Sequence, residues 1–436
     1  MKKPIASVFS PAYPAALLLY GMVFVFAAVH FMAVAWSRPI TVAFYAVVLA
    51  WTLALAWQAR QHLSPITTLD MLFSGFVLLV LASLALGGGL HGAGRKYTHY
   101  LPFMMIAPYL CGRLMRMHDM ELFSRIVMYA GVGILPLLLL DHMVSTDMQE
   151  STRWTYFGQN HTPLLIGALL AAALLVLCSR GATQPNSERG IKPRLMHYSF
   201  IGLIAGFLTL VSARGWLLAA ITGLAALVLS AGRDRALRVE YSRRLCLVVA
   251  VVLLSLAVLP HASKQFYANL LTVPTPAVEP TPAVEPTPAV GPILGEESCR
   301  PFRERINSVA MRWVLYREAI AMFAHSPIIG VGAARFGDRS CTGASGFPHS
   351  TVLQAFSELG LVGGGTLLAL LLQAGTAFAR QNRRDAIGPF ALALFVAFLV
   401  ADQIYGNLFM ASGTYLLLGL AAGTLAEIKR ESVAHG

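Results

Sequence analysis

One short stretch of the sequence holds a histidine in a setting that suits proton transfer. Residues 346–365 read GFPHSTVLQAFSELGLVGGG, in which His349 follows Pro348 and precedes an apolar run. Thr351 and Gln354 match a capping box, which predicts that a helix begins beside the histidine. The partial positive charge of a helix N-terminus disfavours imidazolium, so the ring should stay neutral and accept a proton. A proton acceptor at a membrane surface suggests chemistry on a lipid-linked substrate; alternatively, His349 only caps or hydrogen-bonds a turn.

Arg214 lies in LVSARGWLLA, between two apolar runs with almost no loop. An arginine at the face of a membrane is costly unless an anion uses it. Phosphate is the natural partner, because the guanidinium fork matches its geometry. The alternative is that Arg214 extends to lipid headgroups without binding a substrate.

Three further residues are candidates for a site around this histidine. Arg312 lies on a predicted helix at 304–324, close to Trp313, and its alternative is a solvated helix face. Arg153 precedes TYFGQNHTP and is a further candidate cation. Asp402, in VADQIYGN, can orient a histidine or an arginine, or it is a simple interface residue. The apolar face of the 304–324 helix is predicted to comprise Ile306, Val309, Trp313, Tyr316, Ile320 and Phe323.

Composition places these residues in an all-α, polytopic membrane protein. Of 436 residues, 56% are hydrophobic and 12% are charged, against about 25% charged residues in soluble domains. The first apolar run is too long for the core of a cleavable signal and is predicted to remain as an anchor. The sequence predicts twelve spans: 12–36, 39–57, 70–90, 99–115, 122–140, 162–178, 198–212, 216–231, 245–259, 361–379, 387–403 and 408–427.

Basic residues in the loops predict the orientation of these spans. The short loops on one side hold only Arg38, Arg95, Lys96, Arg153 and Arg214, so that side is predicted to face outward. Both termini then face the cytoplasm, and most of the net charge of +12 lies in inner loops rather than on a nucleic-acid surface. Three regions follow: 1–260 with nine spans, a periplasmic loop subdomain at 261–358, and 359–436 with three spans.

The long outer segment contains a repeat and two cysteines. The repeat at 274–291 reads PTPAVEPTPAVEPTPAVG, and its prolines favour an extended polyproline spacer without chemistry. Cys299 and Cys341 lie in an oxidising compartment if the orientation is right, which predicts a disulfide between them. The alternative is two free thiols.

In combination, these features resemble the O-antigen ligase family (WaaL, with related Wzy-type polymerases). The resemblance rests on the twelve spans, the late outer loop, Arg-x-x-x-Leu at 214–218, HSPIIGVGAARFG, and His349-Ser350 followed by ELGLVG. The proline repeats are outside the shared pattern.

The resemblance implies a GT-C-like fold in the bacterial inner membrane and a metal-independent, inverting glycosyltransferase without a cofactor. The donor would be polysaccharide on undecaprenyl pyrophosphate, and the acceptor a sugar hydroxyl of lipid A–core. His349 matches the family's base, Arg214 its membrane-edge arginine, Arg312 its loop arginine and Asp402 its late acid. Arg153 is an additional candidate for the pyrophosphate.

Other functions stay open at this level. A Wzy-type polymerase or an O-linked protein oligosaccharyltransferase would use the same kind of donor with a different acceptor. A secondary transporter also suits twelve spans, although no repeat relates the two halves and polar residues gather at one face. The sequence contains no Walker A loop, GxGxxG motif or His-Glu-x-x-His motif, so nucleotide hydrolysis and zinc proteolysis are not indicated.

Overall fold

The long apolar runs of the sequence fold into helices. The computed structural model describes residues 10–32, 38–63, 65–86, 100–144, 162–180, 191–211, 214–232, 234–258, 308–340, 347–381 and 388–434. Within these ranges the regular elements are all helical, and no strand occurs. The all-α prediction is therefore confirmed for the described part of the chain.

The first half of the bundle contains the helices before the long outer segment. They are α1 (Ala12–Ala16), continued by the π-helical turn η1 (Leu17–Gly21) and α2 (Met22–Phe31); α3 (Arg38–Gln58); the short η2 (Arg60–Leu63); α4 (Thr68–Leu86); η4 (Leu101–Ile106), continued by α6 (Ala107–Leu114); α7 (Met117–Val144); α8 (Thr162–Ser179); α9 (Ile191–Leu210); α10 (Arg214–Ser230); and α11 (Arg235–Val258).

The second half contains the helices from residue 308 onward. They are α14 (Ser308–His325), the short α15 (Phe336–Arg339), α16 (Thr351–Gln381), α17 (Gly388–Asp402) and α18 (Ser412–Ala434). Helix α16 kinks at Gly360, where the backbone leaves helical geometry. The predicted domain boundary at 358 falls inside α16, two residues before this kink.

Six of the described helices are long and apolar enough to cross a membrane. They are Ala12–Phe31, Pro39–Gln58, Thr68–Leu86, Asp119–Asp141, Arg235–Val258 and Thr351–Gln381. Shorter apolar helices cover Leu101–Leu114, Leu164–Ser179, Leu195–Leu210, Gly215–Ser230 and Gly388–Asp402. Each of the twelve predicted ranges overlaps an observed helix, while the number of true spans and their direction stay predictions.

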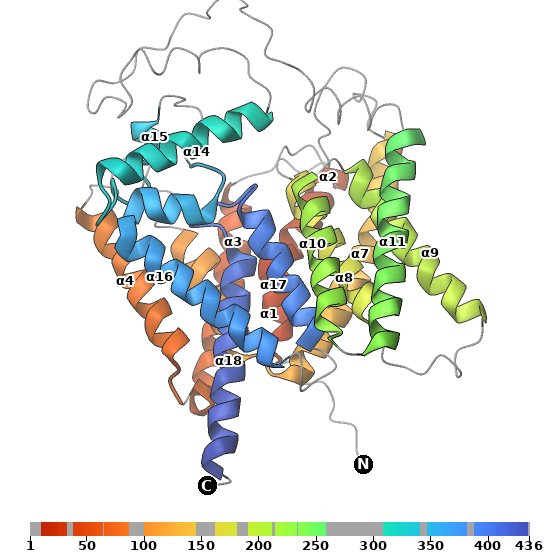
Figure 1. The fold of residues 1–436 in the computed structure, drawn as a ribbon, viewed down its shortest axis with the longest axis horizontal. Coiled ribbons are helices and arrows are strands. Elements are labelled where there is room, and N and C mark those ends of the chain that lie inside the picture. Colours follow the sequence, from red (N-terminus) through yellow and green to blue (C-terminus); the bar gives the residue numbers. More distant parts are fainter. Residues whose placement is uncertain are drawn as a thin grey trace, which may run out of the picture.

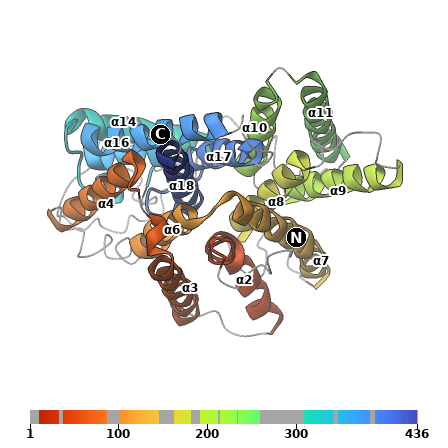
Figure 2. The ribbon, with the colours of Figure 1, turned by 90° about the horizontal axis from the view of Figure 1, so that it is seen from below.

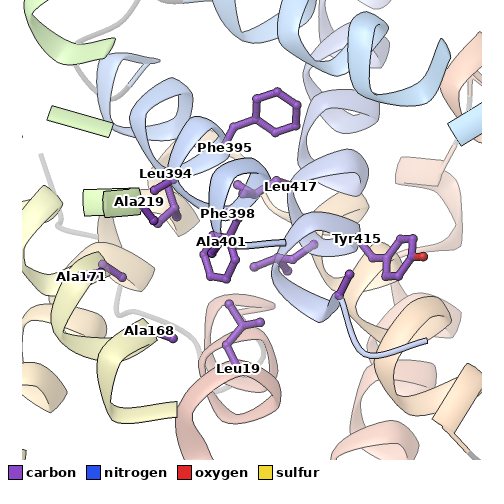
Figure 3. Packing of buried hydrophobic residues seen from close by; sticks show 14 of the residues in the cluster. Leu19, Ala168, Ala171, Ala219, Leu394, Phe395, Phe398, Ala401, Tyr415 and Leu417 are labelled. Carbon is purple, nitrogen blue, oxygen red and sulfur yellow. The ribbon is translucent and has the colours of Figure 1, made fainter. Parts of the chain in front are cut away.

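The helices form two groups that meet at α10 and α17. Helices α4, α14, α16 and α18 gather on one side and α7, α8, α9 and α11 on the other (Figures 1 and 2). Small residues line the junction: Ala168 and Ala171 of α8 and Ala219 of α10 face Phe398 and Ala401 of α17 (Figure 3). Small side chains let helix backbones approach closely, which is how apolar helices associate in lipid.

Helix α14 lies across one end of the bundle, on the face opposite to the end of α18 (Figure 1). Its side chains Leu315, Ala319 and Met322 are buried with Phe336 of α15. The predicted apolar face is wrong in part, because Trp313 and Ile320 are 65% and 56% exposed. The helix carries two apolar stripes. The stripe that contains Leu315 and Ala319 is the one that is buried against the rest of the protein.

At the opposite end, a buried ion pair fastens α4 to α6. The Arg113 Nε lies 2.9 Å from the Asp70 Oδ1, and the arginine side chain is 3% exposed. Arg113 also donates to the carbonyls of Leu63 and Pro65, and the Tyr109 hydroxyl donates to the same carboxylate. The pair is fully hydrogen-bonded, which is the condition under which a buried charge is tolerated.

We expect Arg113→Met to lower the free energy of unfolding by about 3 kcal/mol, because it leaves the Asp70 carboxylate largely buried without its cation. Thermal unfolding of the purified protein in detergent measures the loss. Arg125→Met is the matched control, since its pair with Glu121 is exposed and should contribute less than about 0.5 kcal/mol. Equal losses in the two variants would contradict the assigned role of the buried pair.

Candidate active site

Four separate elements meet in one cluster at the end of the bundle where α14 lies. They are α14 itself, the N-terminus of α16, the N-terminus of α10, and residues 403–411, which we call the α17–α18 turn. Hydrogen bonds between these elements, described below, bring residues up to 190 positions apart into one cluster. The side chains of this cluster include His349 and Arg312, two of the residues that the sequence singles out.

His349 lies directly before the first turn of α16. Its backbone has φ of +58°, a left-handed conformation that is uncommon for residues other than glycine, although histidine is among those that adopt it more readily. This conformation places Ser350 as the N-cap of α16, where its hydroxyl accepts a hydrogen bond from the Leu353 N–H at 3.2 Å. The ring of Phe347 packs edge to face against the imidazole, with 4.6 Å between the two ring centres. The predicted position of the histidine at a helix N-terminus is confirmed.

The predicted capping box at Thr351 and Gln354 is wrong by one position. Thr351 is the first residue of the helix, and its hydroxyl donates to the Asp402 carbonyl at 3.3 Å. The Gln354 amide oxygen accepts from the Leu408 N–H at 2.8 Å, so this side chain points into the protein. Ser350 is the N-cap residue instead. Its hydroxyl accepts a hydrogen bond from the helix backbone and donates one to the Gln403 side-chain oxygen at 2.7 Å.

The environment of the His349 ring keeps it neutral. Burial lowers the pKa of the imidazole to about 4, and the nearby positive charge of Arg312 contributes in the same direction. The Nδ1 atom is buried, and no residue in the described ranges is hydrogen-bonded to it. A neutral ring with a free nitrogen can accept a proton, as the sequence predicts, but the causes are desolvation and a guanidinium.

Arg312 reaches from α14 to the α17–α18 turn. Its Nε donates to the Ile404 carbonyl at 3.1 Å, and its guanidinium carbon lies 5.4 Å from the ring centre of Tyr405. One turn further along α14, the Tyr316 hydroxyl donates to the Gln403 carbonyl at 2.6 Å. Among the described residues no carboxylate pairs with Arg312, so the terminal nitrogens of its guanidinium are available for an anion.

Arg214 is the first residue of α10, and its side chain lies outside the described part of the structure. The next residue places the backbone. The Gly215 N–H donates to the Tyr405 hydroxyl at 2.8 Å, and Tyr405 is the ring that Arg312 covers. Arg214 therefore enters α10 beside the element that holds Arg312. Arg153, Cys299, Cys341 and the repeat at 274–291 lie outside the described residues.

Among the described side chains, Asp402 makes no contact with a histidine or an arginine, which was one of the two roles that the sequence left open. Its carboxylate accepts a hydrogen bond from Thr414 of α18 rather than from a histidine or an arginine. It borders a small cavity of about 10 Å³ that Thr351 and Tyr415 also line, roughly the room that one water molecule needs. Asp402 contributes to the site through its main chain, whose carbonyl holds Thr351.

A second acid, Glu358, was not recognised as a site residue from the sequence. It is fully buried and accepts hydrogen bonds from the backbone N–H groups of Ala334 at 3.0 Å and Phe336 at 3.2 Å, and from the Gln354 side chain at 3.2 Å. The acid thereby fastens the glycine-rich loop 326–335 to α16. An acidic residue four positions after a glutamine in an otherwise apolar helix was the available signal.

The loop 326–335 and α16 also interlock through their backbones. A Cβ at Gly360 would lie 2.3 Å from the Ile328 oxygen, and one at Gly330 would lie 2.3 Å from the Glu358 carbonyl carbon. Both glycines have positive φ, so both the conformation and the close approach require the absence of a side chain. The Leu361 N–H donates to the Pro327 carbonyl at 2.7 Å across this contact.

Part of the chain is similar to a known protein family. Residues 198–370 match the family model Wzy_C, described as O-Antigen ligase. The chain carries a domain of the O-antigen ligase family. The matched range contains Arg214, Arg312, His349 and Glu358, and it ends before the α17–α18 turn. No curated protein matches the chain.

We expect Glu358→Ala to loosen the loop 326–335, because two backbone N–H groups lose their acceptor. Unsatisfied buried donors cost about 1–3 kcal/mol each, so trypsin should cleave after Arg335 or Arg339 at least about tenfold faster. Mass spectrometry of the fragments gives the rate. Asp338→Ala removes an exposed acid from the same segment and serves as the control. Unchanged cleavage of the Glu358 variant would argue against this anchor.

Proposed function

We propose that this chain is an O-antigen ligase that transfers polysaccharide from undecaprenyl pyrophosphate to a sugar hydroxyl of lipid A–core, at the periplasmic face of the bacterial inner membrane. The observation that carries the proposal is a buried, neutral histidine whose pKa is lowered by burial and by the charge of Arg312, an arginine without a carboxylate partner among the described residues. They lie at one end of a bundle of apolar helices (Figure 1). A base and a cation at such an end suit a reaction between two membrane-anchored substrates.

In the proposed reaction, His349 acts as general base. The unprotonated nitrogen of its neutral ring takes the proton of the acceptor hydroxyl while the acceptor oxygen attacks the anomeric carbon of the donor sugar. The bond from that carbon to the pyrophosphate oxygen breaks, and the electron pair leaves with the diphosphate. A general base typically contributes about 10²- to 10⁴-fold to the rate. A single displacement of this kind inverts the anomeric centre.

The negative charge that grows on the leaving diphosphate needs a cation in place before the reaction. Arg312 is the proposed first cation, because the Ile404 carbonyl occupies its Nε and leaves its terminal nitrogens without a carboxylate among the described residues. Arg214, at the adjacent end of α10, is the proposed second cation, and Arg153 a third. In this scheme the arginines neutralise the diphosphate and no metal ion or cofactor takes part.

The proposed topology places α14 and His349 outside the cytoplasm. It rests on the basic residues of the predicted inner loops, and it agrees with the position of α14 opposite the end of α18. A Cys299–Cys341 disulfide remains part of the proposal for the outer segment. The polar cluster at an end of the bundle, rather than halfway along it, favours surface chemistry over solute transport.

The acceptor separates the proposed ligase from its relatives. A Wzy-type polymerase would join the donor chain to another lipid-linked chain, and an O-linked protein oligosaccharyltransferase would join it to a serine or threonine. The same base and cations serve all three reactions. A reconstituted assay with labelled donor and three acceptors in separate reactions identifies the product: lipid A–core for a ligase, donor lipid for a polymerase, and a serine-rich peptide for protein glycosylation.

We expect His349→Ala to reduce transfer to lipid A–core by at least about 100-fold, because the general base is lost. The measurement uses purified protein in liposomes with labelled lipid-linked donor, together with a thermal unfolding curve to verify folding. His325→Ala is the matched control, since His325 is exposed at the C-terminal end of α14. Wild-type transfer by a folded His349→Ala protein would end the proposal.

The pH dependence should report on the electrostatic effect of Arg312 on the His349 ring. With a pKa of about 4, His349 is protonated below that value and neutral above it, so kcat/KM should rise through pH 4 and level off. Arg312→Gln removes a charge that disfavours imidazolium, which raises the pKa and shifts this limb to higher pH. The limb should not move in Arg317→Gln, a change of an exposed arginine on the same helix. A limb that stays in place in Arg312→Gln would refute the electrostatic effect.

A further inference from the structure

Tyr405 of the α17–α18 turn touches both cationic elements of the candidate site. Its hydroxyl accepts the Gly215 N–H at 2.8 Å, in the first turn of α10. Its ring lies beneath the guanidinium of Arg312, 5.4 Å from the guanidinium carbon to the ring centre. The neighbouring Ile404 carbonyl accepts from Arg312 Nε at 3.1 Å. One short segment therefore contacts the start of α10 and the side chain that comes down from α14.

The contact with α10 is closely fitted. A Cβ at Gly215 would lie 2.2 Å from a carbon of the Tyr405 ring, which is closer than any real side chain comes. Gly215 is itself buried. The tyrosine ring therefore packs against the main chain of α10, and the position of the Arg214 backbone follows from that of Tyr405.

The contact with Tyr405 and Ile404 fixes the orientation of the Arg312 guanidinium. The aromatic face attracts the guanidinium, and the Ile404 carbonyl occupies Nε, so the pair of terminal nitrogens remains as the free edge of the fork. A diphosphate offers two phosphate groups at a fixed separation. Two arginines bind both groups at once only if the spacing between the arginines is fixed as well.

We propose that Tyr405 is a positioning residue that sets the spacing between the start of α10, at Arg214, and the guanidinium of Arg312, so that the site prefers a lipid diphosphate to a lipid monophosphate. This inference rests on the proposed function and deepens it. The residue lies outside the range that matches the family model. It acts through the two arginines and takes no part in proton transfer.

Three variants separate the two contacts of Tyr405. Tyr405→Phe keeps the ring under Arg312 and removes the acceptor for the Gly215 N–H. Tyr405→Leu removes both contacts. Gly215→Ala approaches the same contact from α10, because the new methyl group must displace the ring. Tyr198→Phe is the matched control, since it deletes a tyrosine hydroxyl that donates to Glu240 in a distant pair of helices.

The experiment measures binding of undecaprenyl pyrophosphate and undecaprenyl monophosphate to the purified full-length protein in detergent micelles, with kcat and donor KM in parallel. We expect Tyr405→Phe to weaken diphosphate binding about 5-fold, as the loss of one hydrogen bond does, and Tyr405→Leu or Gly215→Ala to weaken it at least about 30-fold. Monophosphate binding should change less than about 2-fold. Donor KM should rise while kcat stays within about 3-fold.

The outcomes distinguish the two levels of the argument. If the wild-type protein binds neither lipid, the proposed function fails whatever Tyr405 does. If the wild type prefers the diphosphate and Arg312→Ala loses that preference, but folded Tyr405→Phe and Gly215→Ala proteins retain it, the proposed function stands and this inference is wrong. Equal losses for both lipids in the Tyr405 variants would show a merely structural role and would also overturn it.

Discussion

Backbone carbonyls at the end of α17 hold the candidate site together. The carbonyls of residues 402–404 accept hydrogen bonds from Thr351 of α16 and from Tyr316 and Arg312 of α14. The last carbonyls of any helix have no partner within the helix, so they are free to serve in this way. Because these acceptors belong to the main chain, their positions follow from the packing of α17 against α10 and α18. The geometry of the site thus depends on the membrane bundle below it.

A second set of hydrogen bonds lies near the C-terminal end of α14. Here a side chain is the acceptor and the main chain supplies the donors. The side-chain acid, Glu358, accepts hydrogen bonds from the N–H groups of Ala334, in the loop 326–335, and of Phe336, the first residue of α15. The Ala333 N–H of this loop also donates to Ser83 of α4 at 2.8 Å. The loop is therefore tied to two helices of the bundle. Together with the α17–α18 turn, this loop fixes both ends of α14 and so holds Arg312 against Ile404 and Tyr405.

Much of this arrangement could be predicted from the sequence, and the parts that could not have physical reasons. Apolar runs of span length are a strong signal, so the helical ranges and the start of a helix beside His349 were predicted. The buried side of α14 was predicted poorly, because Trp313 and Leu315 belong to two apolar stripes and periodicity does not say which one meets a partner. Tyr405 and the carbonyls beside it were missed, since a main-chain acceptor leaves no mark in the residue types.

Asp402 also shows that the residue type does not reveal which of its groups makes the contact. The sequence left two roles open for this acid, orienting a histidine or an arginine, or lying at the interface. Its carboxylate accepts a hydrogen bond from Thr414, and its carbonyl is the group that holds Thr351. The neutral state of His349 was predicted for an incomplete reason. A helix terminus was expected to cause it, while burial and Arg312 are the causes found.

The grip on α14 has a consequence for the 49 positions between the end of α11 at Val258 and the start of α14 at Ser308. The helix is oriented by contacts of its own, so the connecting chain need only be long enough to reach it. A change in the number of six-residue units in the proline-rich repeat therefore need not move Arg312 or His349. The placement of the reacting groups is separate from the length of the segment that precedes them.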